Sequence, residues 1–216
     1  RVMRRDAVIF PFWENAALVA ESKCILLALA FAIFAVLGVI GDEVIHTERT
    51  TPESFELQEL FARMRDAGCT HVVMEVSSHA LALGKTAPLD FEVGVFTNLS
   101  PEHTDFHETA ERDFEAKKQL FRASRIGVTN GGDPCGARLP REVTGPQRWI
   151  VCRDGSAAPD VGTVEPAAPF ERCGADDVRL DGLRGVGYRL ITPSARLRVT
   201  CPVPGIFTVI NSLEAA

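Results

Sequence analysis

Four polar side chains follow an apolar run in the stretch "VVMEVSSHALALGK", residues 72–85, and they differ in chemistry. They are the carboxylate of Glu75, the hydroxyls of Ser77 and Ser78, and the imidazole of His79. An ordinary turn depends on residues that permit its backbone geometry, such as Gly, Pro, Asn or Asp. The mixture found here therefore indicates a site rather than a plain connection.

A second group of such side chains lies in "NLSPEHTDFHETAERDFEAKKQLF", residues 98–121. Glu75 and His103 together could hold a hard cation such as Mg²⁺, with waters and phosphate oxygens completing its shell. An alternative is a zinc site of a hydrolase, because His103, Asp105 and His107 have the spacing of zinc ligands. A third interpretation is that these residues are helix caps and surface imidazoles.

The segment before the first site has the pattern of an amphipathic helix. Its apolar positions recur at i, i+3, i+4 and i+7: Leu57, Leu60, Phe61 and Met64. We expect Thr51 to cap this helix, with Pro52 at its first position and Gly68 at its end.

Further along, strand and helix patterns alternate. Strands are predicted at residues 70–76, 91–99 and 125–130, and a second helix at 109–121. This alternation predicts the α/β class, with a mostly parallel, twisted sheet flanked by helices. Ligands bind beyond the carboxyl ends of strands in such sheets, so the polar groups at 75–79, 98–107 and 130–133 should converge on one edge.

The pattern changes from about residue 140. Residues 153–176 are rich in Ala, Gly, Pro, Asp and Glu, which favours turns or an exposed insertion. Residues 177–190 and 195–205 then alternate in polarity, which predicts a small antiparallel β part. A helix is expected to begin in "FTVINSLEAA", residues 207–216, and we expect the domain to be truncated at this end.

Composition limits the class of protein. The chain has 216 residues, 46% of them hydrophobic and 24% charged, which favours a globular protein with one large domain. Its net charge of −6 gives no reason to expect nucleic acid as a partner. No two of the six cysteines are close enough for a CxxC pair, so we expect reduced, mostly buried thiols in a cytoplasmic protein. We separately expect the protein to be a monomer.

Residues 24–41, "CILLALAFAIFAVLGVIG", contain no charged side chain, and Arg1, Arg4 and Arg5 precede them. We expect a buried helix that runs into a core strand, because Gly38 and Gly41 interrupt the run. A membrane-spanning segment is an alternative, since about 20 apolar residues span a bilayer. A signal peptide is a third, although no small-x-small cleavage site follows.

Six segments follow one another in the order "ERTTPESFELQ", "THVVMEVSSHALALGK", "VFTNLSPEHTDFH", "FEAKKQLF", "GVTNGGDPCGARL" and "VPGIFTVINSLEAA". Together they resemble the central domain of the Mur ligases, most closely the type that forms the tripeptide of peptidoglycan precursors. The resemblance predicts a central domain at residues 41–216, with an atypical apolar segment at 1–40.

The resemblance also implies site residues. Metal ligands would be Glu75, His103 and Lys117, where Lys117 matches the family's carbamylated lysine and both Lys117 and His103 match catalytic positions. The positions that match contacts to the UDP-muramoyl substrate are Thr50, Thr51, Ser77 and Lys85. The positions that match the nucleotide site are Asn98, Asn130, Asp133 and Asn211.

The implied activity is ATP-dependent and uses Mg²⁺. A carboxylate of UDP-N-acetylmuramoyl-L-Ala-D-Glu would attack the γ-phosphate, and the amine of an amino acid would then displace phosphate from the acyl phosphate.

One family motif is missing from the sequence. The Gly-rich phosphate loop that ends in Gly-Lys-Thr-Thr is replaced by "FWENAALVAESKCILLALAF", where Lys23 is present without glycines. Two alternatives to an active ligase therefore stay open. One is an inactive remnant that binds the UDP-muramyl peptide or nucleotide, and the other is a membrane-tethered α/β protein.

Overall fold

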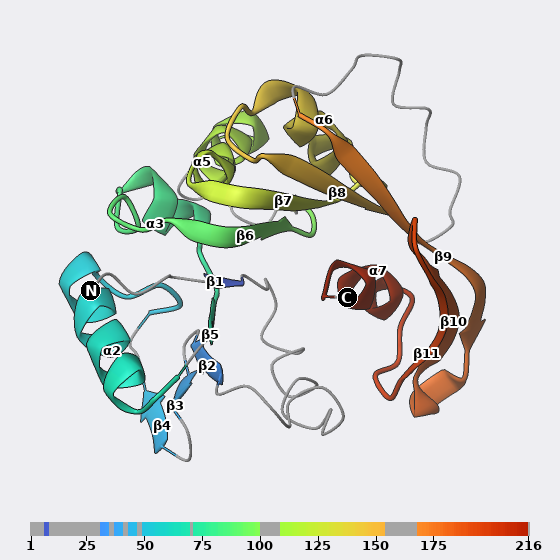
Figure 1. Ribbon diagram of the computed structural model, residues 1–216, viewed down its shortest axis with the longest axis horizontal. Coiled ribbons are helices and arrows are strands. Elements are labelled where there is room, and N and C mark those ends of the chain that lie inside the picture. The colour runs from blue at the N-terminus through green and yellow to red at the C-terminus, as the bar shows by residue number, and fades with distance from the viewer. Residues whose placement is uncertain are drawn as a thin grey trace. The chain divides into compact units, whose positions relative to one another are not determined.

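The computed structural model describes residues 7–8, 31–34, 37–40, 43–46, 49–69, 71–99, 109–153 and 168–215. The chain forms two compact units. The first unit comprises Arg1–Gly94 and Thr104–Ser124, and the second comprises Val95–His103 and Arg125–Ala216. Figure 1 shows the elements of both units along the chain.

The first unit has a mixed sheet. Its strands lie in the order β6 (Phe91–Phe96), β1 (Ala7–Val8), β5 (His71–Met74), β2 (Phe31–Phe34), β3 (Leu37–Ile40) and β4 (Glu43–His46). β1 pairs in parallel with β5 and β6, and β2 pairs in parallel with β5. These pairings confirm the predicted parallel sheet, whereas the antiparallel pairs of β3 with β2 and β4 were not predicted.

In the described part of the first unit, the helices are α2 (Ser54–Asp66), α3 (Ser78–Ala82) and α5 (Ala110–Arg122). Leu57, Leu60 and Met64 of α2 are buried, as their spacing predicted. Gly68 follows the end of α2 at a φ of 79°, a conformation that only glycine adopts without strain. Thr109 caps α5 by accepting a hydrogen bond from the Arg112 amide.

The prediction that Thr51 caps α2 is wrong. The N-cap is Glu53, whose amide donates to the Glu56 carboxylate at 2.7 Å. A glutamate three residues along can satisfy an N-terminal donor of a helix, so α2 needs no hydroxyl cap from Thr51. The Thr51 side chain therefore serves another contact, described below.

The second unit contains the predicted antiparallel part. β7 (Ser124–Asn130), β8 (Arg148–Arg153) and β9 (Phe170–Leu180) are parallel, and β10 (Val186–Ile191) pairs antiparallel with β9 and with β11 (Arg196–Cys201). A 3₁₀ turn, η2 (Gly182–Arg184), connects β9 to β10. The predicted C-terminal helix is α7 (Phe207–Ala215), which packs on β8, β9 and β10, inside the curve of β9 to β11 in Figure 1.

Two regions of the second unit differ from expectation. Residues 170–176 were predicted as turns or insertion but belong to β9, where they pair with both β8 and β10. Helix α6 (Pro134–Glu142), which contains Pro140 in its interior, and strand β8 were not predicted. Residues 154–167 of the predicted insertion lie outside the described residues.

The apolar run at 24–41 is described only in part. Its described segments, Phe31–Phe34 and Leu37–Ile40, are strands, which agrees with the expected passage into a strand. In the portion of the chain that the structure describes, no helix has the length and apolar character needed to span a membrane.

The cysteine prediction is confirmed for the residues that are described. Five cysteines are unpaired, and all but Cys135 are buried: Cys69, Cys152, Cys173 and Cys201.

Candidate functional site

The end of β5 in the first unit brings three predicted site residues together. The Thr51 hydroxyl donates to the carbonyl oxygen of Glu75 at 3.1 Å and accepts from the amide of Ser77 at 3.0 Å. Thr51 is buried, whereas Glu75 and Ser77 are half-buried. Thr51 therefore fixes the backbone on which the side chains of Glu75 and Ser77 are presented.

Ser77 also begins the next helix. Its hydroxyl accepts from the Ala80 amide at 3.2 Å and caps α3. This contact uses one of the two lone pairs of the hydroxyl and leaves its proton available for a ligand. Thr50, which precedes the buried Thr51, is half-buried.

Lys85 is buried and packs against the first residues of α2. Its Nζ is 2.8 Å from Oε1 of Glu53, and its carbonyl accepts from the Ser54 hydroxyl at 2.8 Å. Glu53 also forms an ion pair with Arg49. The hydrogen bond from Lys85 is the main cause that lowers the pKa of Glu53 below its ordinary value. Lys85, the predicted substrate-binding cation, is thus held by Glu53 at the N-terminus of α2.

Lys117 lies on α5 beside a second lysine, and the two are held differently. Lys117 Nζ is 3.1 Å from Oδ2 of the buried Asp113, and 21% of its side chain is exposed. Lys118 is buried, with its Nζ 2.5 Å from Glu115 Oε1 and 4.7 Å from the centre of the Phe114 ring. Lys117 is therefore the more accessible amine of the two, in agreement with the position that the resemblance selects.

The helix of Lys117 and the helix capped by Ser77 are neighbours, because α5 packs against α3. The first unit therefore places Glu75 directly after β5, Ser77 at the cap of α3, and Lys117 on α5, which packs against α3.

The predicted metal site is only partly described. His103, together with Asp105 and His107 of the alternative zinc site, lies outside the described residues. Among the residues that are described, no group of three or more His, Cys, Asp or Glu side chains has the arrangement of a metal site. The assignment of Mg²⁺ to Glu75, His103 and Lys117 stays a prediction. The region predicted to lack the phosphate loop lies largely in residues 9–30, which are not described either.

The turn after β7 in the second unit contains the predicted nucleotide residues Asn130 and Asp133. The Asn130 side-chain oxygen accepts from the Gly132 amide at 2.8 Å. Asp133 Oδ1 caps α6 by accepting from the amides of Cys135 and Gly136, at 2.8 and 2.9 Å. A Cβ at Gly136 would lie 2.2 Å from the Asn130 carbonyl oxygen, so this close approach of helix and turn requires glycine.

Asp133 also holds the segment that follows β6. The Leu99 amide donates to Asp133 Oδ2 at 3.4 Å, and the neighbouring Asn98 is exposed. The Asp133 carboxylate therefore connects the segment after β6, which contains Asn98, to the turn after β7, which contains Asn130.

Helix α7 carries the predicted nucleotide residue Asn211, which is half-buried. Its neighbour Ser212 donates to the Thr208 carbonyl at 2.7 Å and shares a hydrogen bond of 2.8 Å with the Tyr188 hydroxyl. Thr208 donates in turn to the Pro204 carbonyl at 3.3 Å. These bonds fix the face of α7 that presents Asn211.

Glu214 of α7 is a functional candidate that the sequence did not indicate. It is buried, and neither of its carboxylate oxygens has a hydrogen-bond partner among the described residues. Burial raises its pKa to about 9, with a further contribution from the charge of Asp133. The only signal in the sequence is a carboxylate within the otherwise uncharged segment 206–216.

The fold is that of an α/β domain in which polar side chains follow the ends of parallel strands. The family model described as Mur ligase middle domain matches residues 22–216. The chain therefore belongs to the Mur ligase family, as its motifs predicted.

Relatives place it within that family. A UDP-N-acetylmuramoyl-L-alanyl-D-glutamate–2,6-diaminopimelate ligase of Streptomyces coelicolor is 44% identical over 178 residues, covering 82% of this chain and 33% of that protein. A ligase of the same name from Alkaliphilus metalliredigens is 41% identical over 177 residues, covering 82% of this chain and 33% of that protein. The chain thus resembles tripeptide-forming ligases and spans about a third of their length.

Solved structures support the fold. A structure of a ligase with the same name covers 100% of this chain and 42% of its own, with a TM-score of 0.75 and 22% identity. The MurF ligase of Thermotoga maritima in complex with ADP covers 97% of this chain and 44% of its own, with a TM-score of 0.55 and 14% identity. At these identities the likeness establishes the α/β architecture alone.

Proposed function

We propose that this chain is the ATP-using part of a ligase that joins an amino acid to UDP-N-acetylmuramoyl-L-alanyl-D-glutamate. The observation that carries the proposal is the 44% identity to a relative of that name over 82% of the chain. The same relatives favour 2,6-diaminopimelate as the amino acid, which the sequence did not specify. We further propose that it acts as a monomer in the cytoplasm, where ATP is available.

The residues of the first unit fit the acceptor substrate and a metal ion. Glu75 is a half-buried carboxylate directly after a parallel strand, and carboxylates are the protein ligands that Mg²⁺ prefers. When bound, Mg²⁺ would neutralise charge on the phosphates. Lys117, if carbamylated, becomes an anionic ligand; the ion pair with Asp113 at 3.1 Å belongs to the unmodified amine and is given up in that form.

Ser77 and Lys85 have the chemistry to hold the muramoyl substrate. Ser77 has a hydroxyl proton free to donate to a substrate oxygen. Lys85 is a cation whose position Glu53 determines. As a point charge it attracts a substrate carboxylate or phosphate, but without the bidentate geometry of arginine.

The residues of the second unit fit a nucleotide. Asn130 and Asn211 are half-buried amides that can both donate and accept hydrogen bonds with a base or ribose. Asn98 is an exposed amide, and Asp133 holds the turn through its three backbone contacts. In this reaction the substrate carboxylate attacks the γ-phosphate, and the amine then displaces phosphate from the acyl phosphate.

The alternative is a remnant that binds substrate or nucleotide without turnover. The absence of a Gly-rich loop around Lys23 favours it, because backbone amides of such a loop hold the phosphates of ATP.

Calorimetry of Mg²⁺-dependent ATP binding separates these functions. It is performed on this chain, on the Glu75→Gln variant, and on a chain whose residues 12–31 are replaced by a segment with a Gly-rich loop ending in Gly-Lys-Thr-Thr. Binding with phosphate release by the present chain supports the ligase, and Glu75→Gln should then weaken the Mg²⁺ dependence. Binding only by the repaired chain supports the remnant. Absence of binding by both chains would overturn the site assignment.

A further inference from the structure

Two buried cysteines of the second unit are direct neighbours in the sheet. Cys152 of β8 and Cys173 of β9 are Cα partners in a parallel pairing. Neighbouring strands lie about 4.8 Å apart. A disulfide requires a Cα separation of about 4.4–6.8 Å. Pairing in register also places both side chains on the same face of the sheet. The backbone therefore already has the separation that a cross-strand disulfide needs.

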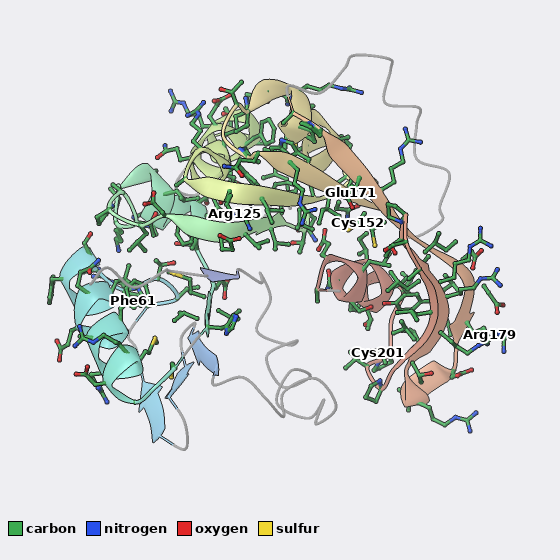
Figure 2. The ribbon with its side chains drawn as sticks, in the orientation of Figure 1. Phe61, Arg125, Cys152, Glu171, Arg179 and Cys201 are labelled. Carbon is green, nitrogen blue, oxygen red and sulfur yellow. The ribbon has the colours of Figure 1, made fainter. Side chains whose placement is uncertain are left out.

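Both sulfurs lie on the face that α7 covers. Cys152 Sγ is 3.7 Å and Cys173 Sγ is 3.9 Å from the same acceptor, the carbonyl oxygen of Leu213. The two sulfurs also form a hydrogen bond with each other. Figure 2 labels Cys152 of β8 and Cys201 of β11, which belong to the same unit. The pairing in register and the shared acceptor define Cys152 and Cys173 as a dithiol pair.

The two thiols differ in acidity. The hydrogen bond with Cys173 and burial raise the pKa of Cys152, whereas the hydrogen bond from Cys152 lowers the pKa of Cys173. Cys173 is therefore the thiol of the pair that forms a thiolate more readily, and a thiolate is the nucleophile in disulfide exchange.

We propose that Cys152 and Cys173 form a redox modification site, which closes to an intramolecular disulfide with a small-molecule disulfide as the oxidant. Cys173 is the more exposed of the two thiols, at 7% against 0% for Cys152, and a local opening of α7 is the step that admits the oxidant. The Cys173 thiolate then attacks one sulfur of glutathione disulfide and releases one glutathione thiolate. The Cys152 thiolate then attacks the protein-bound sulfur of that mixed disulfide and releases the second glutathione. In total, two protein thiols lose two protons and two electrons, and one glutathione disulfide is reduced to two glutathiones.

Peptide mapping tests the proposal directly on the unmodified chain. Trypsin releases Cys152 in residues 149–153, "WIVCR", and Cys173 in residues 173–179, "CGADDVR", each as the only cysteine of its peptide. The native chain is incubated with glutathione disulfide, blocked with N-ethylmaleimide and digested without reduction. We expect a cross-linked species of these two peptides, lighter by two hydrogens than their sum, as the predominant protein disulfide.

Controls separate proximity in the fold from general reactivity. The Cys201→Ser variant removes a buried cysteine of the same sheet and should leave the cross-link unchanged. The chain unfolded in urea should give a mixture of pairings, because the six cysteines then compete. The proposal is overturned if the native chain gives the same mixture as the unfolded chain. It is equally overturned if the half-exposed Cys135 becomes glutathionylated while the two peptides stay unlinked.

Discussion

The hydroxyl of Thr51 connects the segment before α2 to the end of β5. It donates to the Glu75 carbonyl at 3.1 Å and accepts from the Ser77 amide at 3.0 Å. Both bonds are made by a side chain that is 2% exposed, so water cannot replace them. The hydroxyl oxygen of Thr51 thereby holds the backbone between Glu75, the predicted metal ligand, and Ser77, the predicted substrate contact.

Thr51→Val tests this connection, because valine keeps the shape and removes the hydroxyl. The Ser77 amide loses its acceptor, which costs about 1–3 kcal/mol for a buried group. We expect the free energy of unfolding in urea to fall by that amount. Thr51→Ser is the matched control and should lose less, since it keeps the oxygen. A valine variant as stable as the wild type would contradict the role assigned to the hydroxyl.

Lys85→Met tests the coupling between the predicted substrate cation and Glu53. The hydrogen bond from Lys85 is the largest cause of the lowered pKa of Glu53, so its loss should raise that pKa towards 4.5. An NMR titration of the Glu53 carboxyl carbon measures the change. A carboxylate whose pKa is lowered in the folded chain stabilises the fold at pH values above its ordinary pKa. This stabilisation is lost as the pH falls through the lowered pKa. The variant should therefore lose less stability in acid.

Arg49→Met is the control for Lys85→Met. Arg49 also pairs with Glu53, but it contributes less to the lowered pKa than Lys85 does. An equal change in both variants would mean that general charge, rather than the 2.8 Å contact with Lys85, sets the acidity of Glu53.

Gly136→Ala tests the close approach of α6 to the turn at Asn130. The added Cβ would lie 2.2 Å from the Asn130 carbonyl oxygen and 2.9 Å from Thr129 Oγ1, so the turn has to move. Overpacking of this kind costs about 1–3 kcal/mol. Gly187→Ala is the matched control, because its nearest neighbour would be 3.8 Å away. Urea unfolding of both variants checks the difference, and equal stabilities would contradict it.

The sequence predicted the elements whose patterns are local. The buried apolar positions of α2, the helix at residues 109–121 and the alternation in residues 177–190 each appeared as expected. The sequence-based prediction was wrong where contacts with residues distant in the chain determine the role of a side chain. Thr51 looked like a helix cap, and only the packed end of β5 shows which donors and acceptors its hydroxyl meets.

The same limit applies to the candidate site. Glu75, Ser77 and Lys117 could be selected from motifs, but the ion pair of Lys117 with Asp113 and the pairing of Cys152 with Cys173 depend on the folded chain. The first part of β9, residues 170–176, was missed because its Gly, Ala and Asp residues disfavour strands, and pairing on both sides overrides that preference.

Glu214 makes the stability of the chain depend on pH. Its pKa is about 9 in the folded chain and 4.5 as the ordinary value, so between these values the folded state keeps a proton that the unfolded state has lost. Because the folded state then binds more protons, the free energy of unfolding falls as the pH rises through this range. At pH 7 the cost relative to a non-ionising side chain is on the order of 3 kcal/mol.

Glu214→Gln removes this titration and keeps the size of the side chain. We expect the variant to gain on the wild type by up to about 1.4 kcal/mol for each pH unit between pH 5 and pH 8, measured by urea unfolding at each pH. Glu59→Gln, which removes an exposed carboxylate of α2, is the control for the loss of one charge. If the two glutamine variants follow the same pH profile, Glu214 is not the group that keeps its proton. If the stability of Glu214→Gln differs from that of the wild type and of Glu59→Gln increasingly above pH 5, the Glu214 carboxyl is the titrating group. Below that pH the carboxyl is protonated in both the folded and the unfolded chain, so its ionisation adds no difference in stability.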